Sequence, residues 1–190
     1  PVEYDVQIPY DGNRLRTAIL LTDQAILEDI RLNPERESMG STVVACLVNQ
    51  ATVTLVHVGD SRAYLIDTQG IRQITKDHSW VAEQIENGIL TPDEARKHPF
   101  RNVITQALGN GGELDVAIQE YTARPMERIL LCSDGLSGML RDSDIWEIVI
   151  RAEDLEAACA QLIAKAKANG GEDNITVVIL GFEPDGPVLP

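Results

Sequence analysis

Four short segments rich in β-branched residues, each followed by a turn signal, constrain the fold of this chain more than any other feature. The segments are residues 42–48, 52–58, 63–67 and 71–75, and the turns between them are Asn49-Gln50, Gly59-Asp60 and Gln69-Gly70. Runs of this length and composition, separated by such turns, are typical of neighbouring antiparallel strands. The pattern predicts an antiparallel meander over residues 42–75.

Helical patterns lie on both sides of these strands. Apolar residues from Leu15 to Ile30 follow helical spacing, and Asn33-Pro34 ends the pattern. Thr91, Pro92 and Glu94 form a capping-box sequence at the start of a second helix. Further helices are predicted at residues 79–87, 143–151 and 154–168, and strands at 128–133 and 175–181. Helices between two groups of strands favour an α+β fold with antiparallel sheets.

The two ends of the chain lack such patterns. Residues 1–13 read as an irregular lead-in punctuated by proline and Asp-Gly, and residues 182–190 read as a loose, proline-rich tail. We therefore expect one domain over residues 14–181.

Charge and cysteine content narrow the classes of function. The net charge of −14 opposes binding to nucleic acid or to an anionic membrane surface, and it attracts divalent cations. No apolar run approaches the ~20 residues that a membrane span needs. The three cysteines each lie in an apolar run, which predicts buried free thiols and a reducing, cytoplasmic location.

Two acidic residues stand where predicted strands end or begin. Asp134 follows the strand at 128–133, with Gly135 after it, and Asp173 precedes the last strand. If these strands are antiparallel neighbours, both carboxylates lie at one sheet edge, where they suit Mg²⁺ or Mn²⁺ better than zinc. Asp beside Gly is also common in ordinary turns, so the spacing leaves both interpretations open.

Six motifs in order connect these residues to a known family. They are Gly40-Ser41-Thr42, His57-Val58-Gly59-Asp60-Ser61-Arg62, Asp77-His78-Ser79, the segment 98–109, Ser133-Asp134-Gly135 and Gly171-Glu172-Asp173-Asn174-Ile175-Thr176. This series resembles that of the bacterial metal-dependent protein serine/threonine phosphatases of the type 2C kind. The resemblance implies an antiparallel β-sandwich flanked by helices on both faces, with a centre of two Mn²⁺ or Mg²⁺ ions. It also implies hydrolysis of phosphoserine and phosphothreonine in proteins by a metal-bridged water, opposing serine/threonine kinases.

The resemblance assigns roles residue by residue. Asp134 and Asp173 match metal ligands, and Asp77 matches a position that helps Asp134 to hold a third, weaker metal. Asp77 could instead cap the helix that starts near Ser79.

Residues 78–101 resemble the mobile flap of the family. His78 and His98 are the candidates there for proton transfer, because histidine titrates near neutrality. Either could instead be an ordinary loop or cap histidine, and this alternative fits His98 better, so His78 is our first candidate.

The family's upstream elements are missing from this sequence. A phosphate-binding Arg, an acidic metal ligand and an Asp-Gly-Met-Gly-Gly segment have no counterpart before residue 15, so we expect the N-terminal strands to be absent. The similarity covers roughly residues 15–180, about the last two-thirds of a family domain.

Two functional hypotheses follow. The first is a phosphatase acting on a phosphorylated protein or peptide, with no nucleic-acid partner and no membrane segment, and monomeric. The second is a catalytically silent regulatory or binding module.

Overall fold

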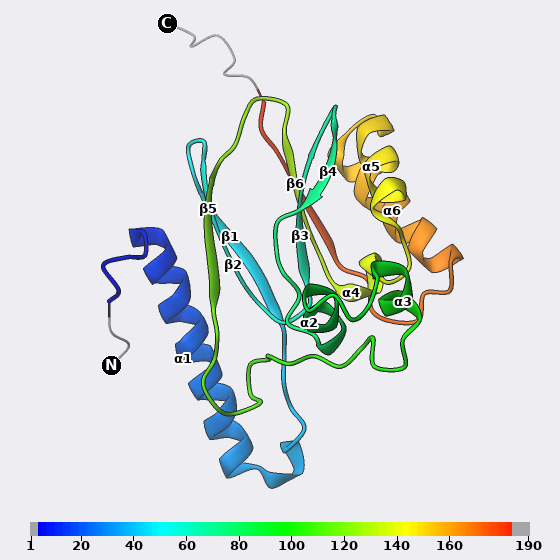
Figure 1. Ribbon diagram of the computed structural model, residues 1–190. Helices are drawn as coiled ribbons and strands as arrows, with labels where there is room; N and C mark the ends of the chain where they lie inside the picture. The colour runs from blue at the N-terminus through cyan, green and yellow to red at the C-terminus, as the bar shows by residue number, and fades with distance from the viewer. Residues whose placement is uncertain (1–3, 184–190) are drawn as a thin grey trace, which may run out of the picture. The chain divides into compact units, whose positions relative to one another are not determined.

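The computed structural model describes residues 4–183, which group into two compact units (Figure 1). The first unit contains residues 4–60 and 77–121, and the second contains residues 61–76 and 122–183. Each unit has its own helices, sheet and core.

The first unit combines a long helix with a three-stranded sheet of order β1-β2-β5. Its elements are α1 (Tyr10–Leu32), η1 (Pro34–Arg36), β1 (Val43–Asn49), β2 (Thr52–Val58), α2 (Trp80–Glu86), α3 (Pro92–Lys97) and β5 (Ala117–Thr122). Strands β1 and β2 form an antiparallel hairpin in which Val43 pairs with Val58 and Asn49 with Thr52. Helix α1 runs beside this sheet, and its Ile19 packs with buried residues of β2 (Figure 1).

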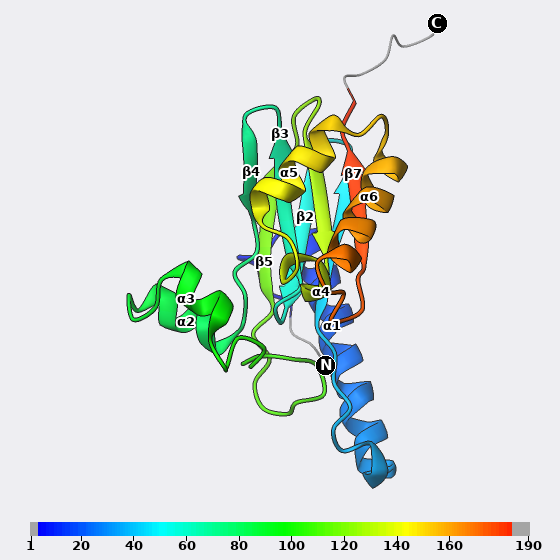
Figure 2. The same ribbon diagram turned by 90° about the vertical axis from the view of Figure 1, so that its right-hand side faces the viewer.

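The second unit holds a four-stranded antiparallel sheet of order β4-β3-β6-β7. Its elements are β3 (Arg62–Asp67), β4 (Gly70–Gln73), β6 (Arg128–Cys132), α4 (Asp134–Ser137), α5 (Asp142–Arg151), α6 (Leu155–Ala168) and β7 (Val177–Gly181). Helices α5 and α6 cover one face of this sheet (Figure 2). The Trp146 indole N–H of α5 donates to the Asp67 carbonyl oxygen at 2.9 Å, which ties this helix to the end of β3.

A single core joins these helices to the sheet. Tyr64, Leu130 and Cys132 from the strands pack with Leu136, Ile145 and Leu162 from the helices, and each is at most 2 % exposed. Burying such apolar side chains supplies most of the stabilisation of a small domain. Strands β6 and β7 are therefore held in place by a well-packed hydrophobic core.

The predicted meander is wrong, because β2 and β3 belong to different sheets. The predicted strands lie within about two residues of the observed ones, but they form two separate hairpins, β1-β2 and β3-β4. Gly59 lies at the break with φ +101°, and a Cβ there would lie 2.3 Å from Thr42 Cγ2. The left-handed backbone of Gly59 turns the chain out of the first sheet.

Three elements have no counterpart in the sequence pattern: η1, β5 and α4. Strand β5 gives a weak signal because its surface positions, such as Gln119 and Glu120, interrupt the apolar pattern. The short helix α4 has the sequence of a glycine-punctuated turn. Each of the remaining helices and strands after residue 76 lies within about two residues of its predicted bounds.

The predicted lead-in is too long, since α1 begins at Tyr10 rather than near Leu15. Asn13 is buried and its amide donates to the carbonyl oxygens of Asp5 (2.8 Å) and Ile8 (2.9 Å). The preceding segment is thus folded onto the first turn of the helix by polar contacts, which leave no apolar signature in the sequence. The predicted tail falls largely outside the described residues, although Phe182 is bonded to Met126 and Glu127.

The α+β class with antiparallel sheets is confirmed. The cysteines are free thiols as expected, but only Cys132 is fully buried, and Cys46 and Cys159 are half-buried. Among residues 4–183, no helix is both long enough and apolar enough to cross a membrane.

Candidate active site

Strands β6 and β7 bring the two predicted acidic positions to one sheet edge. They pair antiparallel, with Cys132 at the end of β6 opposite Val177 at the start of β7. The pairing continues beyond the strands, because the Ser133 N–H donates to the Thr176 carbonyl oxygen at 3.2 Å. The chain leaving β6 therefore passes beside the chain entering β7, which meets the condition under which both carboxylates lie at one sheet edge.

The side chain of Ser133 fastens these two segments together. Its Oγ donates to the Asn174 carbonyl oxygen and accepts from the Thr176 N–H, both at 3.0 Å. One hydroxyl thus satisfies two backbone groups of the loop that carries Asp173. The sequence pattern assigns Ser133 no role, since its partners are more than 40 residues away.

Gly135 allows the same close approach on the other side of Asp134. A Cβ at this position would lie 2.3 Å from the Asn174 carbonyl oxygen. Only a residue without a side chain leaves the loop and the start of α4 in contact.

Asp134 and Asp173 are both exposed as whole residues, but the Asp134 carboxyl group is partly shielded from solvent. Partial burial and then the negative charge of Asp173 raise the pKa of Asp134, and hydrogen bonds from backbone N–H groups together with the Arg62 guanidinium act in the opposite direction. The Asp173 Oδ1 accepts from the Asn174 N–H at 2.6 Å, which fixes this carboxylate within its turn.

This donor set fits a hard divalent cation. A carboxylate whose pKa is raised by a neighbouring negative charge is stabilised in its ionised form when a cation binds beside it. Across the described residues, no group of three or more His, Cys, Asp or Glu side chains could hold a metal ion, so Asp134 and Asp173 stand as a pair.

Asp77 and His78 lie in the first unit, ahead of α2. The cap of this helix is Ser79, whose Oγ accepts from the Ala82 N–H at 3.3 Å. The capping interpretation of Asp77 is therefore wrong, and its metal role stays a prediction.

His78 is bonded to the end of the β2 hairpin. The backbone N–H of His78 donates to the Gly59 carbonyl oxygen at 3.0 Å, and the ring Nδ1 of His78 accepts from the Gly59 backbone N–H at 3.3 Å. An accepting Nδ1 carries no proton, so only Nε2 can carry one in this arrangement. Its ring lies 4.8 Å from that of the buried His57.

His98 takes part in a local aromatic cluster of the flap. It is the C-terminal cap residue of α3, its ring stacks on Trp80 at 4.8 Å, and its Nδ1 accepts from the Phe100 N–H at 3.2 Å. These contacts give His98 a structural role.

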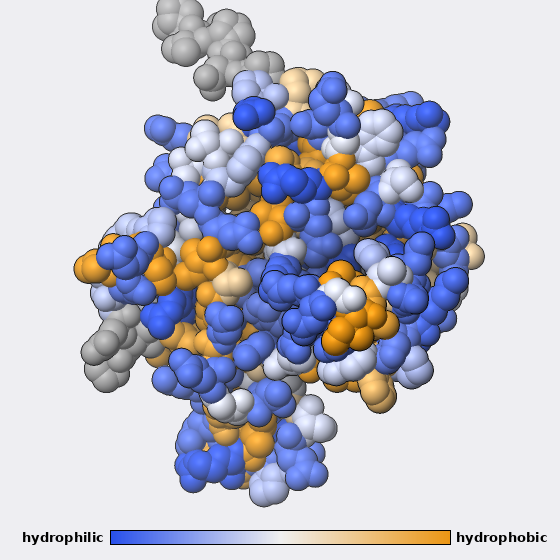
Figure 3. All heavy atoms as spheres, in the orientation of Figure 1, coloured by the Kyte–Doolittle hydropathy of each residue, from blue (hydrophilic) through white to orange (hydrophobic). Residues whose placement is uncertain are grey.

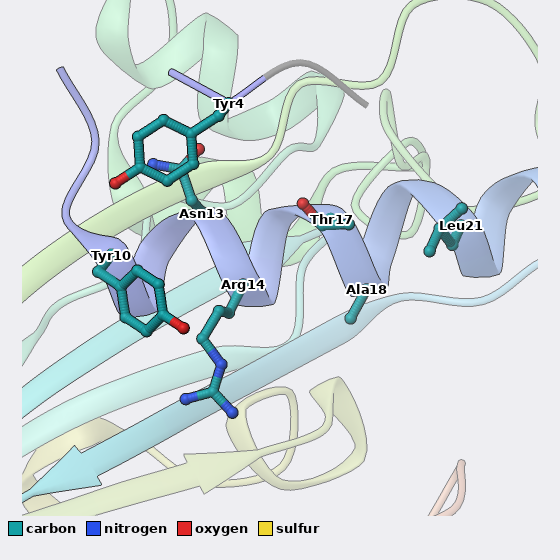
Figure 4. A pocket seen from close by; sticks show the side chains of 7 residues that line it. All are labelled: Tyr4, Tyr10, Asn13, Arg14, Thr17, Ala18 and Leu21. Carbon is teal, nitrogen blue, oxygen red and sulfur yellow. The ribbon is translucent and has the colours of Figure 1, made fainter. Parts of the chain in front are cut away.

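A surface pocket of about 390 Å³ lies against α1 and contains none of the predicted site residues (Figure 4). Its lining includes Tyr4, Tyr10 and Arg14. Arg14 already pairs with Asp11 at 3.0 Å and lies over the Tyr10 ring.

Comparisons with known proteins identify the family. The model of the family described as Protein phosphatase 2C matches residues 6–84. The serine/threonine phosphatase stp of Listeria monocytogenes is 36% identical over 173 residues, which cover 89% of this chain and 69% of that protein.

The chain belongs to the protein phosphatase 2C family.

Solved structures of the family agree with this assignment. The serine/threonine phosphatase Stp1 of Staphylococcus aureus matches 97% of this chain and 72% of its own, at 31% identity and a TM-score of 0.88. The catalytic domain of the serine/threonine protein phosphatase PstP, crystallised with two manganese ions, matches 83% of this chain and 65% of its own, at 39% identity and a TM-score of 0.74. The predicted family, fold class and enzyme class, a phosphoprotein hydrolase, are thereby confirmed, and divalent metals belong to the family's chemistry.

Proposed function

We propose that this chain carries the Asp134–Asp173 half of the metal centre of a protein phosphatase that hydrolyses phosphoserine and phosphothreonine with Mn²⁺ or Mg²⁺. The observation that carries the proposal is the convergence of the two carboxylates at the β6-β7 edge of a type 2C phosphatase. The Listeria monocytogenes relative is a serine/threonine phosphatase by name, which supports phosphoproteins as the substrate class.

The role of the two aspartates is to hold cations through their carboxylate oxygens. When bound, a divalent cation neutralises phosphoryl charge and lowers the pKa of a coordinated water. The chemistry of the pair suits oxygen-seeking cations, and the two manganese ions of the PstP structure favour Mn²⁺.

We also assign roles in the proposed reaction to two residues of the first unit, Asp77 and His78. Asp77 contributes to a third and weaker cation site. His78 serves proton transfer through Nε2, because its Nδ1 is engaged by the Gly59 N–H.

The proposed setting is a cytoplasmic, monomeric enzyme that acts on phosphorylated proteins. The excess of acidic residues disfavours nucleic acid as a partner.

The decisive experiment measures turnover of a phosphothreonine peptide by the purified full-length protein with Mn²⁺, with Mg²⁺ and in excess EDTA. We expect activity only with the metals, and a loss of at least about 100-fold on Asp173→Asn, because a charged ligand is removed. Asp115→Asn is the matched control, since Asp115 is also an exposed loop aspartate.

Activity that persists in EDTA, or normal turnover by a folded Asp173→Asn variant, contradicts the proposal. Mn²⁺ binding without any turnover favours the catalytically silent module instead.

A further inference from the structure

The backbone of His78 is held by two neighbouring segments of the first unit. Its N–H donates to the Gly59 carbonyl oxygen at 3.0 Å, and its carbonyl oxygen accepts from the Thr105 N–H at 2.8 Å. Gly59 has little freedom to move, because the side chain of Thr42 lies so close that a Cβ on Gly59 would be 2.3 Å from Thr42 Cγ2. The point at which the His78 side chain leaves the backbone is therefore well defined.

The ring of His78 makes two further contacts. Its Nδ1 accepts from the Gly59 backbone N–H at 3.3 Å, and its centroid lies 4.8 Å from that of the His57 ring, with 33° between the two ring planes. This separation is within the range of ordinary contacts between ring side chains. The hydrogen bond restrains one edge of the His78 ring, and the neighbouring His57 ring limits how far it can rotate.

His57 is a rigid support for this contact. It lies in β2, where it pairs with Val44 of β1, and it is only 1 % exposed. His78, in contrast, is half-buried. A side chain in a close-packed interior is held in one rotamer, whereas a more accessible side chain changes rotamer easily unless its neighbours hold it.

We propose that His57 is a positioning residue, which holds the His78 ring in the orientation that presents Nε2 for proton transfer. The inference rests on the proposed role of His78 in the reaction. His57 is too deeply buried to touch a protein substrate, so it acts through His78 alone. Without it, the His78 ring can turn away from the Gly59 N–H, and a misdirected Nε2 slows the step that depends on it.

The first test is a double-mutant cycle on the turnover of a phosphothreonine peptide by the full-length protein with saturating Mn²⁺. We expect His57→Ala to lower kcat about tenfold with little change in KM, because the catalytic ring is misplaced but still present. His78→Gln should lower kcat about 100-fold, the lower end for loss of a general acid or base. In the His78→Gln background, His57→Ala should have no further effect on kcat, since the residue through which it acts is already gone.

Leu55→Ala is the matched control, because Leu55 lies two residues earlier on the same face of β2 and is 2 % exposed. It should lower the melting temperature, as His57→Ala does, but leave the kcat of the folded protein unchanged. His57→Phe keeps a flat ring beside His78 and should retain most of the turnover, whereas His57→Leu fills the space without a ring and should not. This pair of variants decides the question if His57→Ala fails to fold.

The second test follows the His78 ring directly, in proton–nitrogen correlation NMR spectra of the metal-free protein. The chain has three histidines, so few ring signals need to be assigned. At a pH where the rings are neutral, the wild type should show His78 with its proton on Nε2, because Nδ1 accepts a hydrogen bond. In His57→Ala the two tautomers of His78 should become mixed.

The inference is overturned if His57→Ala leaves kcat undiminished, or lowers it by the same factor in the wild-type and His78→Gln backgrounds, since His57 then does not act through His78. An unchanged His78 tautomer in His57→Ala also overturns it. Normal turnover by a folded His78→Gln variant contradicts the proposed role of His78 itself, and the inference falls with it.

Discussion

At the scale of single residues, the neighbours of Asp134 determine where its carboxylate lies. Ser133 bridges two backbone groups of the loop before β7, and Gly135 leaves space for the Asn174 carbonyl oxygen. Neither residue carries chemistry of its own in the proposed reaction. Both nevertheless fix the distance between the two segments that present the acidic pair.

Gly135→Ala tests this close approach. The added methyl group would lie 2.3 Å from the Asn174 carbonyl oxygen, so the backbone must shift, and we expect a loss of about 1–3 kcal/mol in the free energy of unfolding. Urea denaturation measures this loss in the free energy of unfolding. Gly70→Ala is the control, because nothing lies within 4 Å of a Cβ there, and an equal loss in both variants would contradict the steric explanation.

Asp134→Asn tests the electrostatic coupling through pH. The pKa of Asp134 is raised in the folded protein, so its ionised form destabilises the fold above the folded pKa, and this penalty disappears below the unfolded pKa near 3.8. The metal-free variant should be more stable than the wild type at pH 7, by no more than about 1 kcal/mol at so open a site.

Urea unfolding from pH 3 to pH 7, in EDTA, follows this difference, which should shrink as the pH falls. Asp115→Asn serves as control. A variant less stable than the wild type at pH 7 would show that hydrogen bonds of Asp134 outweigh its repulsion with Asp173.

At the scale of elements, α6 shows how a local signal supports a distant site. Asp154 caps this helix by accepting from the Ala157 N–H at 2.7 Å. One face of the helix then places Ala158, Leu162 and Ala166 in the buried interior of the second unit. The helix is thus part of the support on which β6 and β7 rest.

Asp154→Ala should lower the free energy of unfolding by about 1 kcal/mol, because the cap oxygen is lost. Asp154→Asn should retain most of the stability, and Glu153→Ala, one residue earlier and exposed, should have little effect. Chemical denaturation followed by far-UV circular dichroism compares the three. Equal effects of Asp154→Ala and Glu153→Ala would mean that charge, rather than capping, matters.

At the scale of the whole molecule, the charge of −14 dominates the behaviour expected in solution. The face in Figure 3 is largely hydrophilic, with apolar groups in separate patches. Like charges at this density repel one another and disfavour the compact state.

Raising NaCl should therefore raise the melting temperature of the metal-free protein, since salt screens the repulsion. MnCl₂ at equal ionic strength should raise the melting temperature further. The Asp173→Asn variant should lose this additional increase with MnCl₂ but keep the increase with NaCl. Differential scanning calorimetry measures both effects. A melting temperature that does not rise with NaCl would contradict the role of net charge.

Several features of this protein were determined by the sequence alone, because they depend on residues close together in the chain. The capping box at Thr91 and Glu94 and the boundaries of most strands follow from local backbone and side-chain chemistry. The positions of Asp134 and Asp173 near the ends of strands could also be predicted from the sequence pattern. The ordered motifs indicate the family in the same way, since each motif is a short run of neighbouring residues.

Other features were decided only by tertiary structure, because they depend on pairings between distant residues. Local patterns show that β2 and β3 are strands, but the left-handed turn at Gly59 and the pairing with β5 and β6 assign them to different sheets. The bridge from Ser133 to the loop before β7 and the contact between the rings of His57 and His78 likewise depend on where side chains point after packing. A sequence pattern specifies which face of an element is buried, whereas the partner of that face is specified by the packed core as a whole.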